Sequence, residues 1–420
     1  MRVPLLCFCS ISFVLAVLIP ASLQAQNATP AADIASLRAQ LDALRTEYQT
    51  RIQDLEKQLQ AIQTQLAGAQ APAGAAVVAP AGQSVTGGSV SNAKVFNPDI
   101  AVIGDFLAAA GRNPVNPAPA LEMHESEVSF QAAVDPYARA EFFMSFGHEG
   151  VELEEGFITF PTVPGGLLVK AGKIRAAFGK VNTFHNHMLS WTDRPLVTSN
   201  LVGGEEGIGD AGVSVARLIP NPWMFLEATG QVFRGDSSDL FKSSKRGDLA
   251  YVGHLRGYQD ITDSTNLDLG FSYSRGHNDS GVVFGEDLGR FRTTLYGGDA
   301  TIRWKPLQRS VYHSFVARSE FIWSRRQQPG GLQSGKGFYV SADYQFARRW
   351  WVGGRFDRAD HADDALVHDK GGSAVLTFWP SEFSQLRAQY RRTQYGSGQS
   401  ADELLMQLQF NIGAHGAHPF

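Results

Sequence analysis

The chain ends in the segment LLMQLQFNIGAHGAHPF (residues 404–420), in which apolar and polar residues alternate ahead of a terminal phenylalanine. Polar Gln407, Gln409 and Asn411 lie between small or apolar residues at every second position: Leu404, Met406, Leu408, Phe410, Ile412 and Ala414. A period of two indicates a strand with one apolar face and one wet face. A strand at the very end of a chain needs a neighbour on each edge, and a closed barrel supplies both. The segment therefore favours a barrel.

Similar alternating segments of about ten residues fill the chain from residue 96 onward, and we count sixteen of them. A barrel of that size is wide enough to leave a water-filled lumen. We expect an all-β transmembrane barrel of about 16 antiparallel strands, with strands near 97–106, 124–133, 137–146, 151–160, 167–177, 208–218, 223–233, 248–259, 265–275, 292–304, 311–324, 337–346, 350–358, 372–380, 383–394 and 403–413.

The connections between these segments alternate between short turns, such as TVPGG, IPNP and PSE, and longer loops. Short turns at one end and longer loops at the other are typical of outer-membrane barrels, which keep the short turns in the periplasm. An even number of strands then places both ends of the barrel on the periplasmic side. The longer loops are expected at 107–123, 178–207, 234–247, 276–291, 325–336 and 359–371.

Most segments carry one charged face and one apolar face. In GRFDRA (354–359), for example, Arg355 and Asp357 alternate with apolar Phe356. In a soluble sandwich such apolar faces would form a core, whereas in a wide barrel they face lipid and the charged faces line the lumen. Aromatic residues at strand ends predict interfacial girdles: Trp223, Tyr273, Trp304, Tyr344, Trp350, Trp351 and Trp379.

Three segments of different character precede the barrel. Residues 1–25 indicate a secretory signal peptide, with a short membrane anchor as the alternative. Both cysteines, Cys7 and Cys9, lie within it, so the mature chain would have neither disulfides nor thiolate metal sites. Residues 33–67 repeat apolar positions at steps of three and four, which predicts a coiled coil; a single amphipathic helix lying on another surface is the alternative. Residues 68–95, rich in Ala, Gly and Pro, indicate a flexible linker.

The composition narrows the class of protein. The formal net charge is −4 and charged residues make up 19% of the chain, which argues against a nucleic-acid partner. No apolar run after residue 25 reaches the length of roughly 18 residues that a spanning helix needs.

Four stretches resemble strands of the phosphate-selective porin O/P-like family: AGKIRAAFGKVN (171–182), LYGGDATIRWKP (295–306), GFYVSADYQFARRWWVGGRFD (337–357) and FWPSEFSQLRAQYRR (378–392). A coiled coil ahead of such a barrel is similar to the trimeric DcaP-like porins. The resemblance implies a homotrimer in the outer membrane, in contact with lipid and lipopolysaccharide, with the coiled coil in the periplasm. It also implies that Phe420 is the terminal aromatic residue recognised by the barrel-assembly machinery.

The resemblance further implies that the third external loop, residues 178–207, folds inward and narrows the pore; an ordinary surface loop is the alternative. Its charges would then meet the opposite wall in a focused field. Basic and acidic residues are interleaved, so we expect a slight anion preference, and a dicarboxylate or another small anion suits the guanidinium groups as well as phosphate does. The expected pore-lining and constriction residues are Arg139, Arg175, Lys180, Asp193, Arg194, Glu205, Glu206, Arg318, Glu320, Arg355, Asp357, Arg387 and Arg391.

Three pairs of histidines could suggest a metal site: His185 with His187, His361 with His368, and His415 with His418. No cysteine or carboxylate stands beside them at a familiar ligand spacing, so we expect surface histidines and no metal. The sequence also shows no cofactor motif and no catalytic constellation above chance, so we do not expect an enzyme.

The favoured function is passive diffusion of small hydrophilic solutes, anions among them, through a water-filled pore. One alternative is a structural protein that tethers the barrel to the cell envelope through its coiled coil. A further alternative is a TonB-dependent-type receptor that lacks a plug, although that class usually has a plug domain and about 22 strands.

Overall fold

The computed structural model describes Lys57 and residues 98–413, apart from 148–149, 239, 243–244, 284–285 and 288–289. The predicted signal peptide, coiled coil, linker and terminal Phe420 therefore lie outside the described residues, Lys57 excepted. Contacts divide the chain into two units, Met1–Gln83 and Ser84–Phe420, and the second unit contains the barrel.

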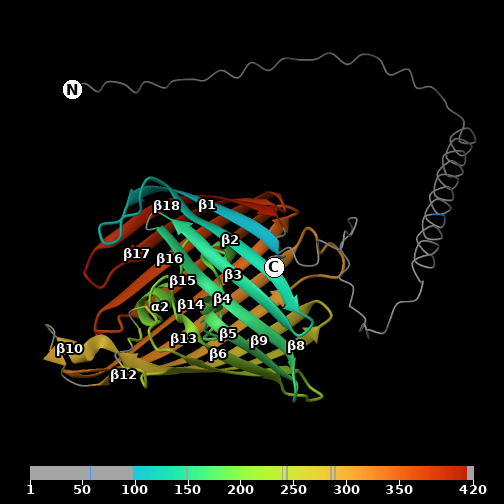
Figure 1. The fold of residues 1–420 in the computed structure, drawn as a ribbon. Coiled ribbons are helices and arrows are strands. Elements are labelled where there is room, and N and C mark those ends of the chain that lie inside the picture. The colour runs from blue at the N-terminus through green and yellow to red at the C-terminus, as the bar shows by residue number, and fades with distance from the viewer. Residues whose placement is uncertain are drawn as a thin grey trace, which may run out of the picture. The chain divides into compact units, whose positions relative to one another are not determined.

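The barrel is closed and consists of sixteen antiparallel strands (Figure 1). The barrel strands are β1 (Asp99–Arg112), β2 (Leu121–Asp135), β3 (Ala138–Gly147), β4 (Gly150–Val163), β5 (Leu167–Arg175), β6 (Gly209–Leu218), β7 (Phe225–Phe233), β8 (Ala250–Thr262), β9 (Thr265–Asn278), β12 (Phe291–Trp304), β13 (Ser314–Gln328), β14 (Gly331–Ala347), β15 (Trp350–Asp360), β16 (His368–Ser381), β17 (Ser384–Gln394) and β18 (Ser400–Gly413). The strand number and the fold class predicted from alternation are confirmed.

The last strand closes the barrel against the first. β18 pairs with β17 on one edge and with β1 on the other, in a register that sets Val102 opposite Ile412 and Phe106 opposite Leu408. The alternating segment at residues 404–413 thus has the two neighbours that a strand at this place requires.

The connections differ in length at the two ends of the barrel. One end, which we call the short-turn end, holds the β2–β3, β4–β5, β8–β9, β14–β15 and β16–β17 turns, together with the start of β1 and the end of β18. The other end, the long-loop end, holds the connection between β5 and β6. The prediction of a long loop at 325–336 is wrong, because β13 and β14 extend to Gln328 and from Gly331 and leave only a two-residue turn. The loop predicted at 107–123 is also shorter than expected, because β1 extends to Arg112 and β2 begins at Leu121.

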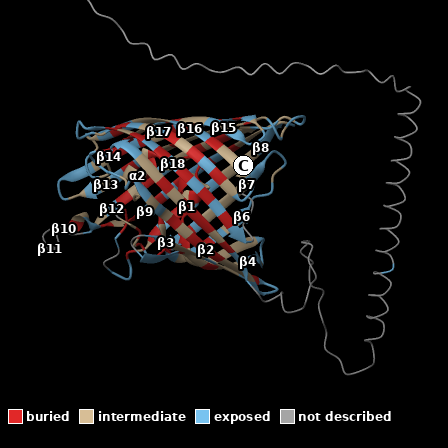
Figure 2. Ribbon diagram, turned by 90° about the horizontal axis from the view of Figure 1, so that it is seen from above, coloured by how far each residue is buried: buried red, intermediate tan, exposed pale blue. Residues whose placement is uncertain are grey.

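Burial alternates along the strands as the sequence pattern predicts. In β14, Tyr339, Ser341 and Asp343 are buried inside the barrel, whereas Val340 and Tyr344 are exposed on its outer surface. Figure 2 shows buried and exposed residues in a chequered arrangement over the wall. The outer face carries the large apolar side chains, which is the arrangement that suits lipid contact.

Two of the aromatic residues expected in interfacial girdles face the lumen instead. Trp351 and Trp379 line an internal cavity together with Arg318. Their neighbours Trp350 and Phe378 stack on the outer face, with ring centroids 4.5 Å apart. The girdle prediction is wrong for Trp351 and Trp379 because it considered position along the strand and not the parity that decides the face.

Short elements complete the fold. They are the 3-10 turns η2 (Val181–Thr183), η3 (Asn186–Met188) and η4 (Asp279–Gly281), the helix α2 (Leu196–Leu201), and a two-stranded sheet of β10 (Val282–Val283) and β11 (Glu286–Asp287). Among the described residues, no helix combines the length and the apolar character needed to cross a bilayer.

Candidate functional site

The connection between β5 and β6, residues 176–208, enters the barrel and is called here the inner loop. Its base is closed by the buried side chain of Asn182, which donates hydrogen bonds to the carbonyl oxygens of Ala176 (2.9 Å) and Ile208 (3.0 Å). Asn182 also accepts a hydrogen bond of 2.7 Å from the Ile208 N–H. Gly207 has φ +62°, and a side chain there would collide with Asn182. The base therefore depends on an asparagine and a glycine that fit together.

The first residues of the inner loop contact β13. Glu320 of that strand accepts hydrogen bonds from the backbone N–H groups of Lys180 (3.4 Å) and Val181 (3.3 Å). Gly179 lies against the same carboxylate with φ +60°, where any Cβ would collide with it. Glu320 is thus a loop-positioning residue as well as a lumen residue.

Apolar packing holds the middle of the inner loop to the wall. Trp191, Val197 and Leu201 of the loop belong to the same buried cluster as Ile322, Tyr339 and Val375 of the strands. Trp191 meets Tyr339 edge to face, with centroids 5.3 Å apart. α2 packs on β13, β14, β15 and β16, as its place inside the barrel in Figure 1 also shows. The expectation that this connection folds inward agrees with these contacts.

A cluster of arginines on β15 and β17 clamps the inner loop at Asp193. The Asp193 carboxylate lies 2.7 Å from Arg355 and 3.0 Å from Arg391, and Gln389 donates a further hydrogen bond to it. Arg355 also donates to the Asp193 carbonyl oxygen (2.9 Å) and stacks 4.9 Å from the Trp191 ring. Charge-assisted and bidentate hydrogen bonds of this kind are among the strong hydrogen bonds in proteins.

Two further residues extend this clamp. Arg387 donates to the carbonyl oxygens of Leu189 (2.8 Å) and Trp191 (3.0 Å). Asp357 accepts a hydrogen bond of 3.2 Å from the Leu196 N–H and pairs with Arg355 at 2.7 Å. Arg355, Asp357 and Arg387 are therefore buried and used to hold the loop.

Arg194 has a different role from the one expected of a constriction residue. Its guanidinium donates to Asn186 (2.9 Å) and to the carbonyl oxygens of Val181 (3.1 Å) and Phe184 (2.8 Å), so it ties the inner loop to itself. Burial and the charge of Arg175 lower the pKa of Arg194 to about 10, which leaves the guanidinium charged at neutral pH. It is buried and lies among loop atoms.

The clamp at Asp193 is expected to resist acid. Burial opposes ionisation of this carboxyl, but the charges of Arg355 and Arg391 outweigh burial and lower its pKa from 3.8 to about 2. A carboxylate with a lowered pKa stabilises the fold above its unfolded pKa, and this contribution is lost as pH falls through the folded pKa. We expect the difference in unfolding free energy between the wild type and Asp193→Asn to stay constant from pH 8 to pH 5 and to shrink toward pH 2. Urea titrations at each pH measure it; a difference already lost at pH 4 would contradict the assignment.

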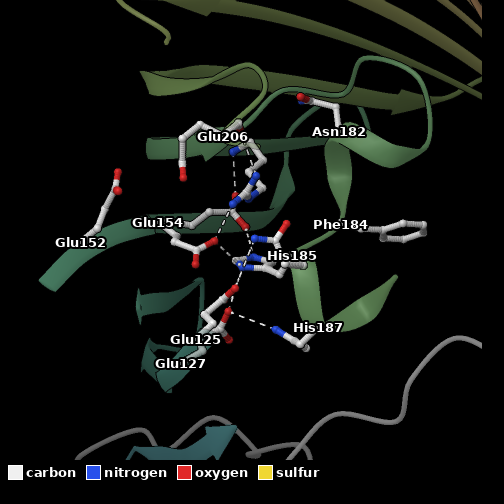
Figure 3. A network of polar contacts seen from close by, with 12 residues as sticks. Glu125, Glu127, Glu152, Glu154, Asn182, Phe184, His185, His187 and Glu206 are labelled. Atoms are coloured by element: carbon white, nitrogen blue, oxygen red, sulfur yellow. Dashed lines mark hydrogen bonds and ion pairs between the residues drawn. The ribbon is translucent and has the colours of Figure 1, made fainter. Parts of the chain in front are cut away.

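A second part of the wall, formed by β2 and β4, is acidic (Figure 3). Glu154 pairs with Arg175 at 2.5 Å, and Glu155 accepts a hydrogen bond from the Arg175 N–H at 2.7 Å. His185 of the inner loop is buried beside them, 2.9 Å from both carboxylates. Burial acts to lower the pKa of His185, but Glu127, Glu154 and Glu155 raise it well above the ordinary histidine value. The expectation of surface histidines is wrong for His185 and His187, which are both 5% exposed.

A basic vestibule lies between the inner loop and the short-turn end. Two adjoining cavities share the lining residues Arg303, Trp351 and Trp379. Their acidic lining residues are Asp343 and Glu382. Their basic lining residues are Lys180, Arg303, Lys305, Arg318, Arg348, Arg349 and Arg387.

The structure brings most of the predicted site residues together and separates three. Arg318 pairs with Asp343 (2.6 Å) in the vestibule. Nine others lie in the inner loop or in the wall around it: Arg175, Lys180, Asp193, Arg194, Glu320, Arg355, Asp357, Arg387 and Arg391. Arg139 lies near the β2–β3 turn, where it is half-exposed and paired with Glu141. Glu205 and Glu206 have exposed side chains near the end of the loop, where the Glu206 carbonyl oxygen accepts a hydrogen bond from Arg175 (3.1 Å).

Sequence reasoning missed Glu125, Glu127 and Glu154, which face His185 and His187, and it missed Trp191. Alternation in HESEVSF (124–130) puts Glu125 and Glu127 on one face, so a signal for two of them was present. Nothing in the sequence indicates that a loop sixty residues away brings histidines to that face.

The comparisons with known proteins support the fold. No family model matches the chain. A protein of Aquifex aeolicus (strain VF5), described only as uncharacterized, is 27% identical over 391 residues, which cover 78% of this chain and 81% of that protein. The anion-selective porin from Comamonas acidovorans has a TM-score of 0.53 at 10% identity, covering 75% of this chain and 99% of the porin. OprB of Pseudomonas putida has a TM-score of 0.53 at 11% identity, covering 76% and 95%.

The chain therefore has the fold of the outer-membrane porins. The outer membrane channel DcaP of Acinetobacter baumannii is also similar, with a TM-score of 0.48 at 11% identity, covering 75% of this chain and 96% of the channel. The more specific resemblance to phosphate-selective porin O/P-like proteins stays a prediction.

Proposed function

We propose that this protein is an outer-membrane porin through which small hydrophilic anions diffuse. The proposal depends above all on the charge of the vestibule, where seven basic side chains and two acidic ones line the cavities between the inner loop and the short-turn end. A cavity lined by one sign of charge and bounded by low-dielectric walls raises the local concentration of the opposite ion.

The geometry of the lumen supports a passage for planar anions. Arg303, Arg318 and Arg387 line the cavity along with the indole rings of Trp351 and Trp379. Guanidinium groups pair with carboxylate and phosphate in a bidentate manner, and aromatic rings offer a flat apolar surface. A small carboxylate suits this combination as well as phosphate does. The similar fold of a porin described as anion-selective agrees with this proposal.

The remaining parts of the proposal concern assembly. It places the barrel in the outer membrane as a homotrimer in contact with lipid and lipopolysaccharide. It also places the 33–67 coiled coil in the periplasm and assigns Phe420 to recognition by the barrel-assembly machinery. Tethering through the coiled coil is compatible with a conducting barrel. A plugless TonB-dependent-type receptor is disfavoured, since the barrel has sixteen strands.

The test is the reversal potential of single channels in a planar bilayer under a potassium chloride gradient. We expect stepwise conductance and a reversal potential on the chloride side. The triple variant Lys305→Glu, Arg348→Glu, Arg349→Glu changes the vestibule lining to four basic and five acidic residues, so its reversal potential should move to the potassium side.

The matched control is Arg392→Glu, which reverses an exposed charge on the outer face of β17. It should leave the reversal potential unchanged. Absence of ion current through a barrel that is shown to be folded would overturn the open-pore proposal. Cation selectivity in the wild type would overturn the anion preference alone.

A further inference from the structure

Two histidines of the inner loop and three carboxylates of β2 and β4 converge where the loop meets the acidic wall (Figure 3). They form two overlapping groups of possible metal ligands, one of Glu127, Glu154 and His185 and the other of Glu125, Glu127 and His187. In each group the donor atoms lie within 4.8 Å of one another, and all five residues are buried. Glu127 belongs to both groups.

The strands are locally modified to present these carboxylates. In β4, Leu153 and Glu155 pair with neighbouring residues of β3, so Glu154 is an extra residue in a bulge. In β2, the register shifts between Met123 and Glu125, so His124 is an extra residue. A bulge breaks the strict alternation and redirects side chains, and bulges are frequent beside functional sites. Here the β4 bulge allows both Glu154 and Glu155 to contact His185.

The distances match the edges of a metal coordination polyhedron. His185 Nδ1 lies 2.9 Å from Glu127 Oε2 and 2.9 Å from Glu154 Oε2, and His187 Nδ1 lies 3.6 Å from Glu127 Oε2. Ligands at about 2.0–2.2 Å from a zinc ion are separated by about 3–3.5 Å in octahedral or tetrahedral geometry. His185 Nδ1 and Glu127 Oε2 are fully buried and 2.9 Å apart, an ion-pair contact that lacks hydrogen-bond geometry. A buried nitrogen and a buried oxygen that face each other without a hydrogen bond point to an ion bound by both.

The charge of the site also favours a cation. Glu125, Glu127 and Glu154 are buried and Glu155 is nearly so, and the guanidinium of Arg175 pairs with Glu154. Uncompensated buried charge is strongly unfavourable, so the cluster needs either a proton on His185 or a metal ion. One carboxylate oxygen, Glu125 Oε1, is buried and has no hydrogen bond.

We propose that this cluster binds a divalent first-row transition metal ion, with Zn²⁺ as the best match to its ligands. The first ligands are His185 Nδ1, Glu127 and Glu154, and the second group adjoins them. Mixed imidazole and carboxylate donors without thiolate suit such ions. Glu155 would orient His185, because its carboxylate lies 2.9 Å from Nε2, which is the carboxylate–histidine–metal arrangement seen around bound zinc. The ion joins the inner loop to β2 and β4, whereas the clamp at Asp193 joins the loop to β15 and β17.

The test is Zn²⁺ binding to the full-length refolded protein in detergent after treatment with a chelator. Competition with a chromophoric chelator at pH 7.5 should give at least one ion per chain. Glu127→Gln keeps the shape of the side chain and removes a ligand common to both groups, so it should weaken binding by about a hundredfold or more. Glu155→Gln should weaken it by roughly tenfold, because it affects only the orientation of His185.

The matched control is His361→Ala. His361 is not a member of the cluster, and its Nε2 lies 3.0 Å from the Asp369 carboxylate. This variant should bind Zn²⁺ as the wild type does. Heat-dependent mobility on a denaturing gel shows whether each variant is folded, and added Zn²⁺ should raise the Tm of the wild type but not that of Glu127→Gln. Absence of binding at micromolar Zn²⁺, or equal affinity in the folded Glu127→Gln variant, would overturn the proposal in favour of a cluster held by the proton of His185.

Discussion

Asp193→Ala is expected to release the inner loop from the β15–β17 wall. The substitution leaves Arg355, which is buried, and the half-buried Arg391 without the carboxylate that lies 2.7 and 3.0 Å from them. Removing one partner of a buried ion pair costs about 3–5 kcal/mol because the other charge stays desolvated. Water can reduce this free-energy cost by hydrating the guanidinium groups, but it reaches them only if the loop moves away from the wall. We therefore expect a larger and noisier single-channel conductance and a lower Tm.

Asp236→Ala is the matched control for that variant. Asp236 makes contacts with Arg234 (3.3 Å) and Lys242 (3.9 Å), but all three side chains are exposed. Exposed ion pairs contribute only about 0–1 kcal/mol, so the control should retain the wild-type conductance and Tm. If Asp193→Ala matched the control in both measurements, the clamp would not be what holds the loop.

Replacing residues 177–207 with a two-residue Asn-Gly turn is expected to have the largest effect on conductance. β5 and β6 already pair up to Arg175 and Gly209, so a tight turn can continue their hairpin. The replacement removes Trp191, α2 and the Asp193 clamp from the lumen while the backbone ladder of the wall stays intact. We expect the conductance to rise roughly two- to fourfold, since the narrowest obstruction sets the resistance of a pore.

The same replacement at residues 282–287, which form the β10–β11 sheet, provides a control for shortening a connection. That sheet is separate from the barrel sheet, so the conductance should change little. An unchanged conductance in the 177–207 variant, in a barrel shown to be folded, would mean that the inner loop does not limit flow.

Much of the barrel could be predicted from the sequence because the alternation of side chains follows directly from strand geometry. Arg355, Asp357, Arg387 and Arg391 face inward as their spacing requires. Strand ends were harder to predict. Gln328 and Gly331 continue the ladder through polar residues that resemble a loop, since backbone hydrogen bonds do not depend on apolar side chains.

The functional site could be predicted only in part. The inner loop was expected from its length and from the family resemblance, and its charged residues were identified. The roles of these residues could not be predicted. Asp193, Arg355 and Arg387 serve mainly to hold the loop, through contacts between residues more than 150 positions apart. The contact between His185 and Glu127 also joins residues that are distant in the sequence.

The seam between β1 and β18 sets a condition on how the chain folds. Contacts across it include the hydrogen bond from Gln407 to Asp105, which joins residues separated by 302 positions, and that from Asn113 to Glu403. Such distant pairing is slow, because the entropy of closing a long chain must be lost before the contact forms. Until then both β1 and β18 are open edges that can pair with other chains. Ring closure is therefore the step at which this protein most needs isolation from its own copies, and its folding yield should fall with concentration more steeply than its stability would indicate.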